Sequence, residues 1–131
     1  MDTELDTRIA RLVKRSDGTL EVRFKKAALL TTEAIDEVLR AREDLCGMGA
    51  YPVLVVLPAD FDFDAGVMTR DHYEGRGLED CTYAVAWDAG SELGEQMVEM
   101  FYRYFPQKFP VKVFRSEKEA DSWLADRDQD R

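Results

Sequence analysis

The sequence is poor in the residues from which most catalytic and metal centres are built. It holds one histidine, His72, and two cysteines, Cys46 and Cys81. A metal site in this chain would therefore depend on carboxylates and thiols. No nucleophile motif surrounds Cys81, and a catalytic histidine would need both a nucleophile and an orienting acid nearby. We expect no enzyme activity and no cofactor, and we expect His72 to be an ordinary surface or helix-face residue.

Positive charge is also scarce, with 18 Lys and Arg residues against 27 Asp and Glu residues and a formal net charge of -9. Nucleic-acid binding needs a basic face, so we expect no nucleic-acid partner. An anionic membrane surface is disfavoured for the same reason. No apolar run approaches the ~20 residues of a membrane-spanning helix, so we also expect no membrane span.

The N-terminal residues 1–6 are acidic and polar, unlike a signal peptide, and this favours a cytoplasmic location. Cys46 and Cys81 are far apart in the sequence, and each has apolar neighbours. Buried cysteines of this kind behave as small hydrophobic residues, so we expect a reduced pair and no disulfide.

What the chain does contain fits one globular domain. Its 131 residues can bury a core, and 45% hydrophobic and 11% aromatic residues argue against disorder. We expect one domain over residues 1–131, with a core at about 7–125 and frayed ends that include the charged tail 126–131.

Patterns of hydrophobicity predict alternating strands and helices. Residues 8–15 and 19–24 are expected to form two strands, joined by a hairpin turn at Asp17 and Gly18. The remaining expected elements are, in chain order, helix 33–45, strand 52–57, helix 69–75, strand 81–87, helix 91–105, strand 111–114 and a helix through 124. Ser116 and Glu119 have the spacing of a capping box at the start of that last helix.

This order predicts the α/β fold class. Strands separated by a helix crossover pair in parallel, whereas the two strands of a hairpin pair antiparallel. We therefore predict a mixed sheet of five strands, in which an N-terminal hairpin is followed by βαβ crossovers, with about four helices packed on it.

Several core segments carry a resemblance to a known family. They are the buried strand 52–57, the strand containing residues 84–86, the aromatic helix end 101–106, the segment 110–114, and Ala120 with Trp123 and Leu124. Over about residues 7–125 the chain resembles the SpoIIAA-like (STAS-like) domains, in particular a group of small uncharacterised bacterial proteins. The resemblance implies a non-catalytic domain that acts through protein–protein interaction or self-association, with a regulatory role.

Anti-sigma-factor antagonists with this fold carry a phosphorylatable Ser or Thr at the start of the helix after the central strand. Their motif there is Asp-Ser or Asp-Thr. The matching region of this chain, residues 68–71, lacks such a dipeptide, and Thr69 is its nearest hydroxyl. Thr69 is therefore the candidate phosphorylation site that the resemblance implies.

The acidic loop 60–71 supports an alternative function. Its carboxylates occupy the first, third, fifth and twelfth positions of an EF-hand loop, and they are Asp60, Asp62, Asp64 and Asp71. The sixth position is Ala65 where that loop needs Gly, and a strand precedes the loop where a helix is required. The segment is thus either a solvated acidic loop or a binding module for a small ligand or a divalent cation.

The helix 91–105 and the segment after it hold more aromatic and Met side chains than one buried stripe needs. This surplus predicts either a larger core or a surface that also lines a dimer interface or a ligand groove. The candidate interface residues are Met100, Tyr102, Phe105 and Phe109. We expect a homodimer or another protein partner.

Basic residues crowd the N-terminal hairpin. They are Arg8, Arg11, Lys14, Arg15, Arg23, Lys25 and Lys26. They either prevent edge-to-edge strand pairing or form a docking surface for an acidic partner.

Overall fold

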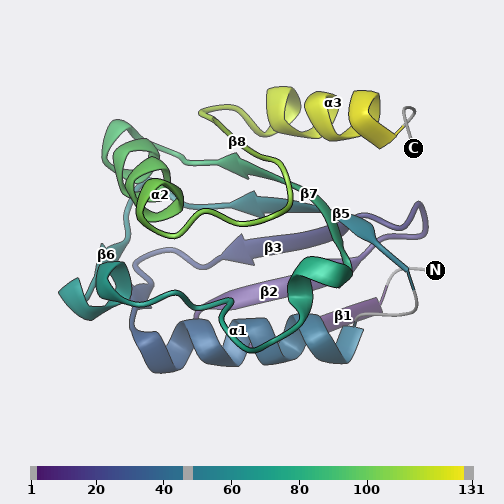
Figure 1. The fold of residues 1–131 in the computed structure, drawn as a ribbon. Helices are drawn as coiled ribbons and strands as arrows, with labels where there is room; N and C mark the ends of the chain where they lie inside the picture. The colour runs from purple at the N-terminus through teal and green to yellow at the C-terminus, as the bar shows by residue number, and fades with distance from the viewer. Residues whose placement is uncertain (1–2, 46–48, 129–131) are drawn as a thin grey trace.

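The computed structural model describes residues 3–45 and 49–128. In chain order, the elements of these ranges are β1 (Thr3–Asp6), β2 (Ala10–Lys14), β3 (Leu20–Phe24), β4 (Leu29–Leu30), α1 (Thr32–Leu45), β5 (Tyr51–Val56), β6 (Asp62–Phe63), the 3-10 helices η1 (Ala65–Thr69) and η2 (Leu78–Asp80), β7 (Thr82–Asp88), α2 (Glu92–Tyr104), β8 (Val111–Phe114) and α3 (Glu117–Asp128). Six strands form one sheet in the order β1-β2-β3-β5-β7-β8 (Figure 1). The predicted α/β fold is confirmed.

The sheet is mixed, as the sequence predicted. The pairs β1–β2 and β2–β3 are antiparallel, whereas β3–β5, β5–β7 and β7–β8 are parallel. A second, two-stranded parallel sheet joins β4 to β6. The hairpin turn between β2 and β3 uses Gly18 at a φ of 94°, which a residue with a Cβ adopts only under strain.

The prediction of five strands was wrong, because β1 adds a sixth strand to the sheet. Leu5 is its one apolar residue, so the segment carries no alternating pattern. The strand is held by its neighbour, and Leu5 lies opposite Leu12 in the antiparallel register. Residues 7–9 turn the chain between β1 and β2, with the Thr7 N–H donating to the Ala10 carbonyl at 2.8 Å.

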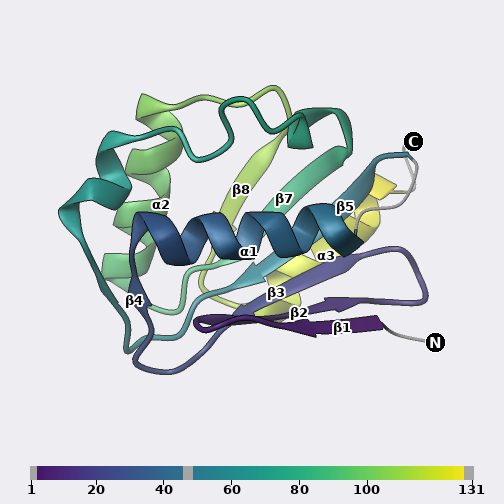
Figure 2. The same ribbon diagram turned by 90° about the horizontal axis from the view of Figure 1, so that it is seen from below.

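Helices cover both faces of the sheet. Helices α1 and α2 lie on one face, and α3 lies on the other (Figures 1 and 2). Successive residues of β5 point to opposite faces, so Val53 and Val55 join the core beneath α1 and α2. Leu54 instead joins a smaller core beneath α3. The larger core contains the candidate site.

Side-chain oxygens cap the three α-helices at the expected places. Thr31 Oγ1 accepts from the Ala34 N–H at 3.1 Å, and Ser91 Oγ accepts from the Gly94 N–H at 3.0 Å. Ser116 Oγ accepts from the Glu119 N–H at 3.4 Å, as the capping-box spacing predicted. Within the described ranges, none of the helices is both long and apolar enough to cross a bilayer.

The predicted helix 69–75 is absent, so the described residues hold three α-helices and not four. The 3-10 helix η1 lies earlier, and the chain after it turns repeatedly before β7. Gly75 and Gly77 adopt φ values of 76° and 72°, which break helical geometry. The segment between β6 and β7, residues 64–81, is called the irregular segment below. It packs against α1 and α2 and brings its aromatic residues into the core.

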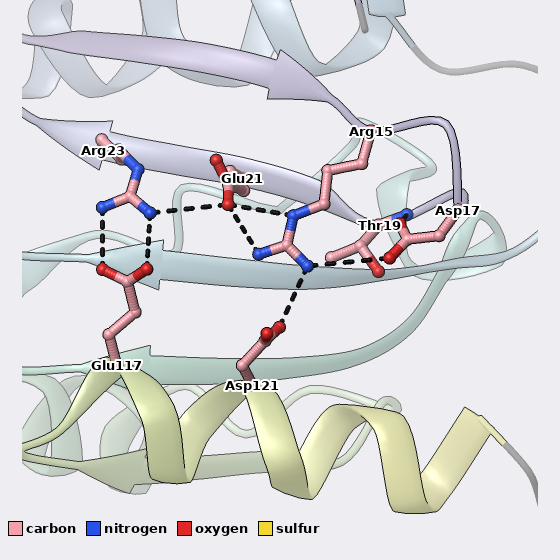
Figure 3. Close-up of polar contacts among 7 residues, drawn as sticks. All are labelled: Arg15, Asp17, Thr19, Glu21, Arg23, Glu117 and Asp121. Atoms are coloured by element: carbon pink, nitrogen blue, oxygen red, sulfur yellow. Dashed lines mark hydrogen bonds and ion pairs between the residues drawn. The ribbon is translucent and has the colours of Figure 1, made fainter. Parts of the chain in front are cut away.

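Arg15 and Arg23 of the hairpin form ion pairs with acidic side chains of the same chain (Figure 3). Arg23 donates to both carboxylate oxygens of Glu117 on α3, at 2.8 and 2.6 Å. Arg15 donates to Asp121 one turn further along α3, at 3.0 Å, and also to Glu21 on β3. These ion pairs connect α3 to the antiparallel half of the sheet and leave these arginines less available for an acidic partner.

Candidate functional site

A cavity of about 100 Å³ lies in the larger core, between the sheet and helices α1 and α2. Its floor comes from β3, β5 and β7, with Val22, Val53 and Val55 among the lining side chains. The irregular segment after β6 contributes further walls through Val67 and Tyr73. Aliphatic, methionine and aromatic side chains make nearly all of this surface, as in sites for small organic ligands.

Hydroxyl and indole groups of the cavity wall form hydrogen bonds with one another. The Tyr73 and Tyr102 hydroxyls are 2.9 Å apart, and Trp87 Nε1 donates to the Tyr102 hydroxyl at 3.3 Å. Burial raises the pKa of Tyr102 well above its usual value, so the phenol is neutral. The aromatic wall is therefore polar at a few atoms but carries no charge.

Arg42 brings a positive charge to this cavity. It lies on the side of α1 that faces the core, and 3% of its surface is exposed. One terminal nitrogen donates to Thr82 Oγ1, and the guanidinium lies 5.7 Å from the Tyr51 ring. The Nε–H is buried and has no hydrogen-bond partner among the described residues.

The surroundings of Arg42 contain phenols in place of carboxylates. Burial acts to lower its pKa, and Tyr73 and Tyr51 act to raise it, with a net rise. A guanidinium remains protonated at any physiological pH. Among the described residues, no carboxylate forms an ion pair with Arg42, although buried charges are normally paired. The cavity therefore has one charged, incompletely bonded group in an apolar wall.

Arg127 Nε is also buried without a partner in the described part of the chain. Its guanidinium lies over the Trp123 ring at the end of α3, away from the cavity lining. Arg127 therefore does not contribute to this site.

His72 is a buried residue, and the expectation of a surface or helix-face position was wrong. Its Nε2 lies 2.8 Å from the Val67 carbonyl and donates to it, while its ring stacks on Phe101 at 5.6 Å. Burial lowers its pKa, which keeps the imidazole neutral. His72 helps to hold the irregular segment against α2.

Two of the predicted interface residues are core residues. Phe109 is 5% exposed and meets the Tyr73 ring edge-on, and Tyr102 lines the cavity. Phe105 is half-buried and packs on Phe101 at 5.4 Å between ring centres. Met100 is the exposed member of the set, at 44%. The surplus of aromatic residues is explained by a second packing partner, the segment after β6, which the sequence placed in a helix.

Three of the four carboxylates of the acidic loop accept hydrogen bonds from the local backbone. Asp62 Oδ1 accepts from the Phe63 N–H at 2.8 Å, and Asp64 Oδ1 accepts from the Gly66 N–H at 3.2 Å. Asp71 accepts from the Tyr73 N–H and from Gln107, while Asp60 is exposed. In residues 3–45 and 49–128, no three His, Cys, Asp or Glu side chains come together as a metal site.

Thr69 lies at the end of η1 and not at the start of a helix. Its side chain is exposed, and Oγ1 donates to the Gly66 carbonyl at 3.0 Å. Phosphorylation of Thr69 stays a prediction. The predicted reduced cysteine pair also stays a prediction, because Cys46 lies outside the described residues.

Sequence reasoning missed Arg42 as a site residue, although the sequence holds a signal for it. Ala34, Val38 and Arg42 are spaced four residues apart along α1, so the arginine continues the apolar stripe. A charged residue in such a stripe has to be paired or functional. Tyr73 and Trp87 gave no comparable signal, because their meeting with Tyr102 depends on the path of the irregular segment.

Comparisons with known proteins agree with this architecture. A family model described as "Domain of unknown function (DUF7793)" matches residues 13–127. A solved structure from Shewanella loihica PV-4, described as an uncharacterized protein from the DUF3478 family with a SpoIIAA-like fold, is 14% identical, with a TM-score of 0.54. That match covers 95% of this chain and 92% of the other, and it shows the SpoIIAA-like fold. No curated protein matched the chain.

Proposed function

The chain belongs to the family described as a domain of unknown function (DUF7793), and from its own site we propose that it is a non-catalytic SpoIIAA-like domain that binds a small, largely apolar molecule in the cavity beneath α1 and α2. The observation that carries the proposal is an apolar cavity with one incompletely bonded buried guanidinium in its wall. Folded proteins rarely keep either feature without a use, since voids and unpaired buried charges both reduce stability.

The size of the cavity limits the ligand. An engineered apolar cavity of roughly 150 Å³ binds benzene. A cavity of about 100 Å³ suits a molecule of about five to eight non-hydrogen atoms, with small adjustments of the lining side chains. The bond between the Tyr73 and Tyr102 hydroxyls uses one of their two protons, which leaves the other for a polar end of such a molecule.

The non-catalytic part of the proposal rests on the state of the groups near the cavity. His72 is held by a carbonyl and a ring stack, and the tyrosines and Trp87 bond to one another. These groups are arranged to pack and to bind, without a nucleophile held by a base in the described part of the site.

A cavity-filling substitution tests this function, with pentanamide as the neutral probe. Val38 lines the cavity, so we expect Val38→Phe to fold normally and to lose the pentanamide signal in saturation-transfer NMR. Val85 is equally buried but does not line the cavity, and Val85→Phe is the matched control, expected to be destabilised by about 1–3 kcal/mol. A wild-type protein that gives no signal with pentanamide would contradict the proposal.

Self-association is a second candidate function, and the outer face of α2 favours it. Leu93, Met100 and Tyr104 are 53%, 44% and 67% exposed and share one helical stripe. The helix begins with Glu92 and carries Arg103 in its last turn. Two copies packed antiparallel along α2 would place each acidic end beside a basic end, which makes this face self-complementary in a symmetric dimer.

Sedimentation over a dilution series tests this candidate. We expect a dimer, and we expect its dissociation constant to rise at least tenfold in Leu93→Ser. Leu29 on β4 is also 53% exposed, so Leu29→Ser is the matched control and should leave the dimer unchanged. A wild-type monomer at every concentration would rule out self-association.

A further inference from the structure

The unpaired charge of Arg42 gives information about the chemistry of the ligand. Arg42 lines the cavity, and its buried guanidinium donates to Thr82 and has an Nε–H without a partner in the described residues. A water molecule would satisfy that hydrogen bond but would leave the charge uncompensated in an apolar surrounding. An anion would satisfy both.

Resting on the proposed function, we propose that the natural ligand of this cavity is a small monocarboxylate whose carboxylate pairs with Arg42 and whose short apolar tail fills the rest of the cavity. A guanidinium presents its N–H groups in a planar fork that matches a carboxylate. Because the wall offers one guanidinium, it balances one negative charge, which favours a monocarboxylate over a phosphate dianion.

The walls around Arg42 support this orientation. The Tyr51 ring and the Thr82 hydroxyl hold the guanidinium at one end of α1. The side chains of Val55, Met97 and Phe101 also line the cavity and offer apolar surface. An aliphatic tail of about four carbons attached to the carboxylate matches the cavity volume of about 100 Å³.

Dissociation constants measured by NMR titration of the intact protein test the inference, with pentanoate and pentanamide as probes. They have the same number of non-hydrogen atoms and differ in charge. We expect pentanoate to bind roughly 10- to 100-fold more tightly than pentanamide, which corresponds to one charge-assisted hydrogen-bonded contact. Arg42→Met should abolish this preference and leave pentanamide binding within about twofold.

Two further variants keep the test decisive. Arg40 is exposed on α1 and pairs with Asp36, so Arg40→Met removes the same charge from the same helix and should keep the preference. Arg42→Lys retains the charge but loses the planar fork, and should weaken pentanoate several-fold without changing pentanamide, even if Arg42→Met fails to fold.

The outcomes separate this inference from the function on which it rests. Equal affinity for the two probes in the wild-type protein, or a preference that survives in Arg42→Met, would overturn the carboxylate assignment and leave the apolar binding function standing. An unchanged pentanoate affinity in Arg42→Lys would count against it in the same way. Binding of neither probe would overturn both.

Discussion

At the scale of single residues, the most unusual feature is the placement of charge. Arg42 takes a position on α1 where the helix otherwise carries small and aliphatic side chains, and its charge faces neutral phenols. On the other face of the sheet, Arg15 and Arg23 are paired with carboxylates in partly exposed positions. Arg15 and Arg23 are thus paired where ion pairs add little stability, whereas Arg42 has no carboxylate partner among the described residues and can pair with a ligand in the core.

His72 gives a pH dependence that can be measured in isolation. Burial lowers its folded-state pKa below the ordinary value of 6.5, so the unfolded chain binds the proton more readily. We expect the free energy of unfolding to be unaffected by this group above about pH 6.5 and to fall as the pH drops below that value.

Denaturant titrations of the wild type and of His72→Phe between pH 7.5 and 5.5 measure this effect. His72 is the one histidine of the chain, so no other imidazole titrates in this window. The wild type should lose stability toward pH 5.5 and the variant should be flatter. Parallel curves would show that the folded state does not disfavour the imidazolium.

At the scale of elements, α3 is held by a modest core and by ion pairs. Its apolar contacts come chiefly from Ala120 and Leu124, and Glu117 and Asp121 connect it to the hairpin arginines (Figure 3). The Arg23 pair lowers the pKa of Glu117. The ion pair therefore contributes to the stability of the fold above the unfolded-state pKa of Glu117, near 4.5. This contribution is lost as the pH falls through the lower folded-state pKa.

We expect Glu117→Gln to cost about 0.5–1 kcal/mol at pH 7, since the pair is partly exposed, and less below about pH 4.5. Glu119 lies in the same first turn of α3, so Glu119→Gln controls for the interaction of a carboxylate with the helix dipole. Thermal unfolding of the two variants measures the difference. Equal losses of stability in the two variants would show that the cost comes from the interaction with the helix dipole and not from the ion pair with Arg23.

The start of α2 depends on a close backbone approach. Gly90 adopts a φ of 72°, and a Cβ there would lie 2.2 Å from the Leu57 carbonyl oxygen. We expect Gly90→Ala to cost about 3 kcal/mol or more, from the left-handed conformation and the clash together. Gly18 has a similar φ and nothing within 4 Å, so Gly18→Ala should cost about 1–2 kcal/mol by chemical denaturation. Equal costs would mean that the backbone at Leu57 moves aside.

At the scale of the whole molecule, local sequence patterns predicted most of the strands and helices. They did not predict the segments whose conformation depends on contacts with residues distant in the sequence. The hairpin, the parallel strands and the capped last helix each carry a signal within about ten residues. Strand β1 is stabilised by pairing with β2, and the segment after β6 is stabilised by ring contacts with α2, so neither has a local pattern. The cavity exists because this segment closes over α1 and α2, and it was out of reach of sequence reasoning for the same reason.

The measurement that most directly tests the account is a methyl-resolved NMR titration of the protein with pentanoate. The two cores provide an internal control, since one sheet separates them. We predict that the methyl signals of Val38, Val55 and Met97 shift with pentanoate while those of Leu54 and Leu124 on the opposite face do not. Unchanged signals, or equal shifts on both faces of the sheet, would contradict binding in the cavity.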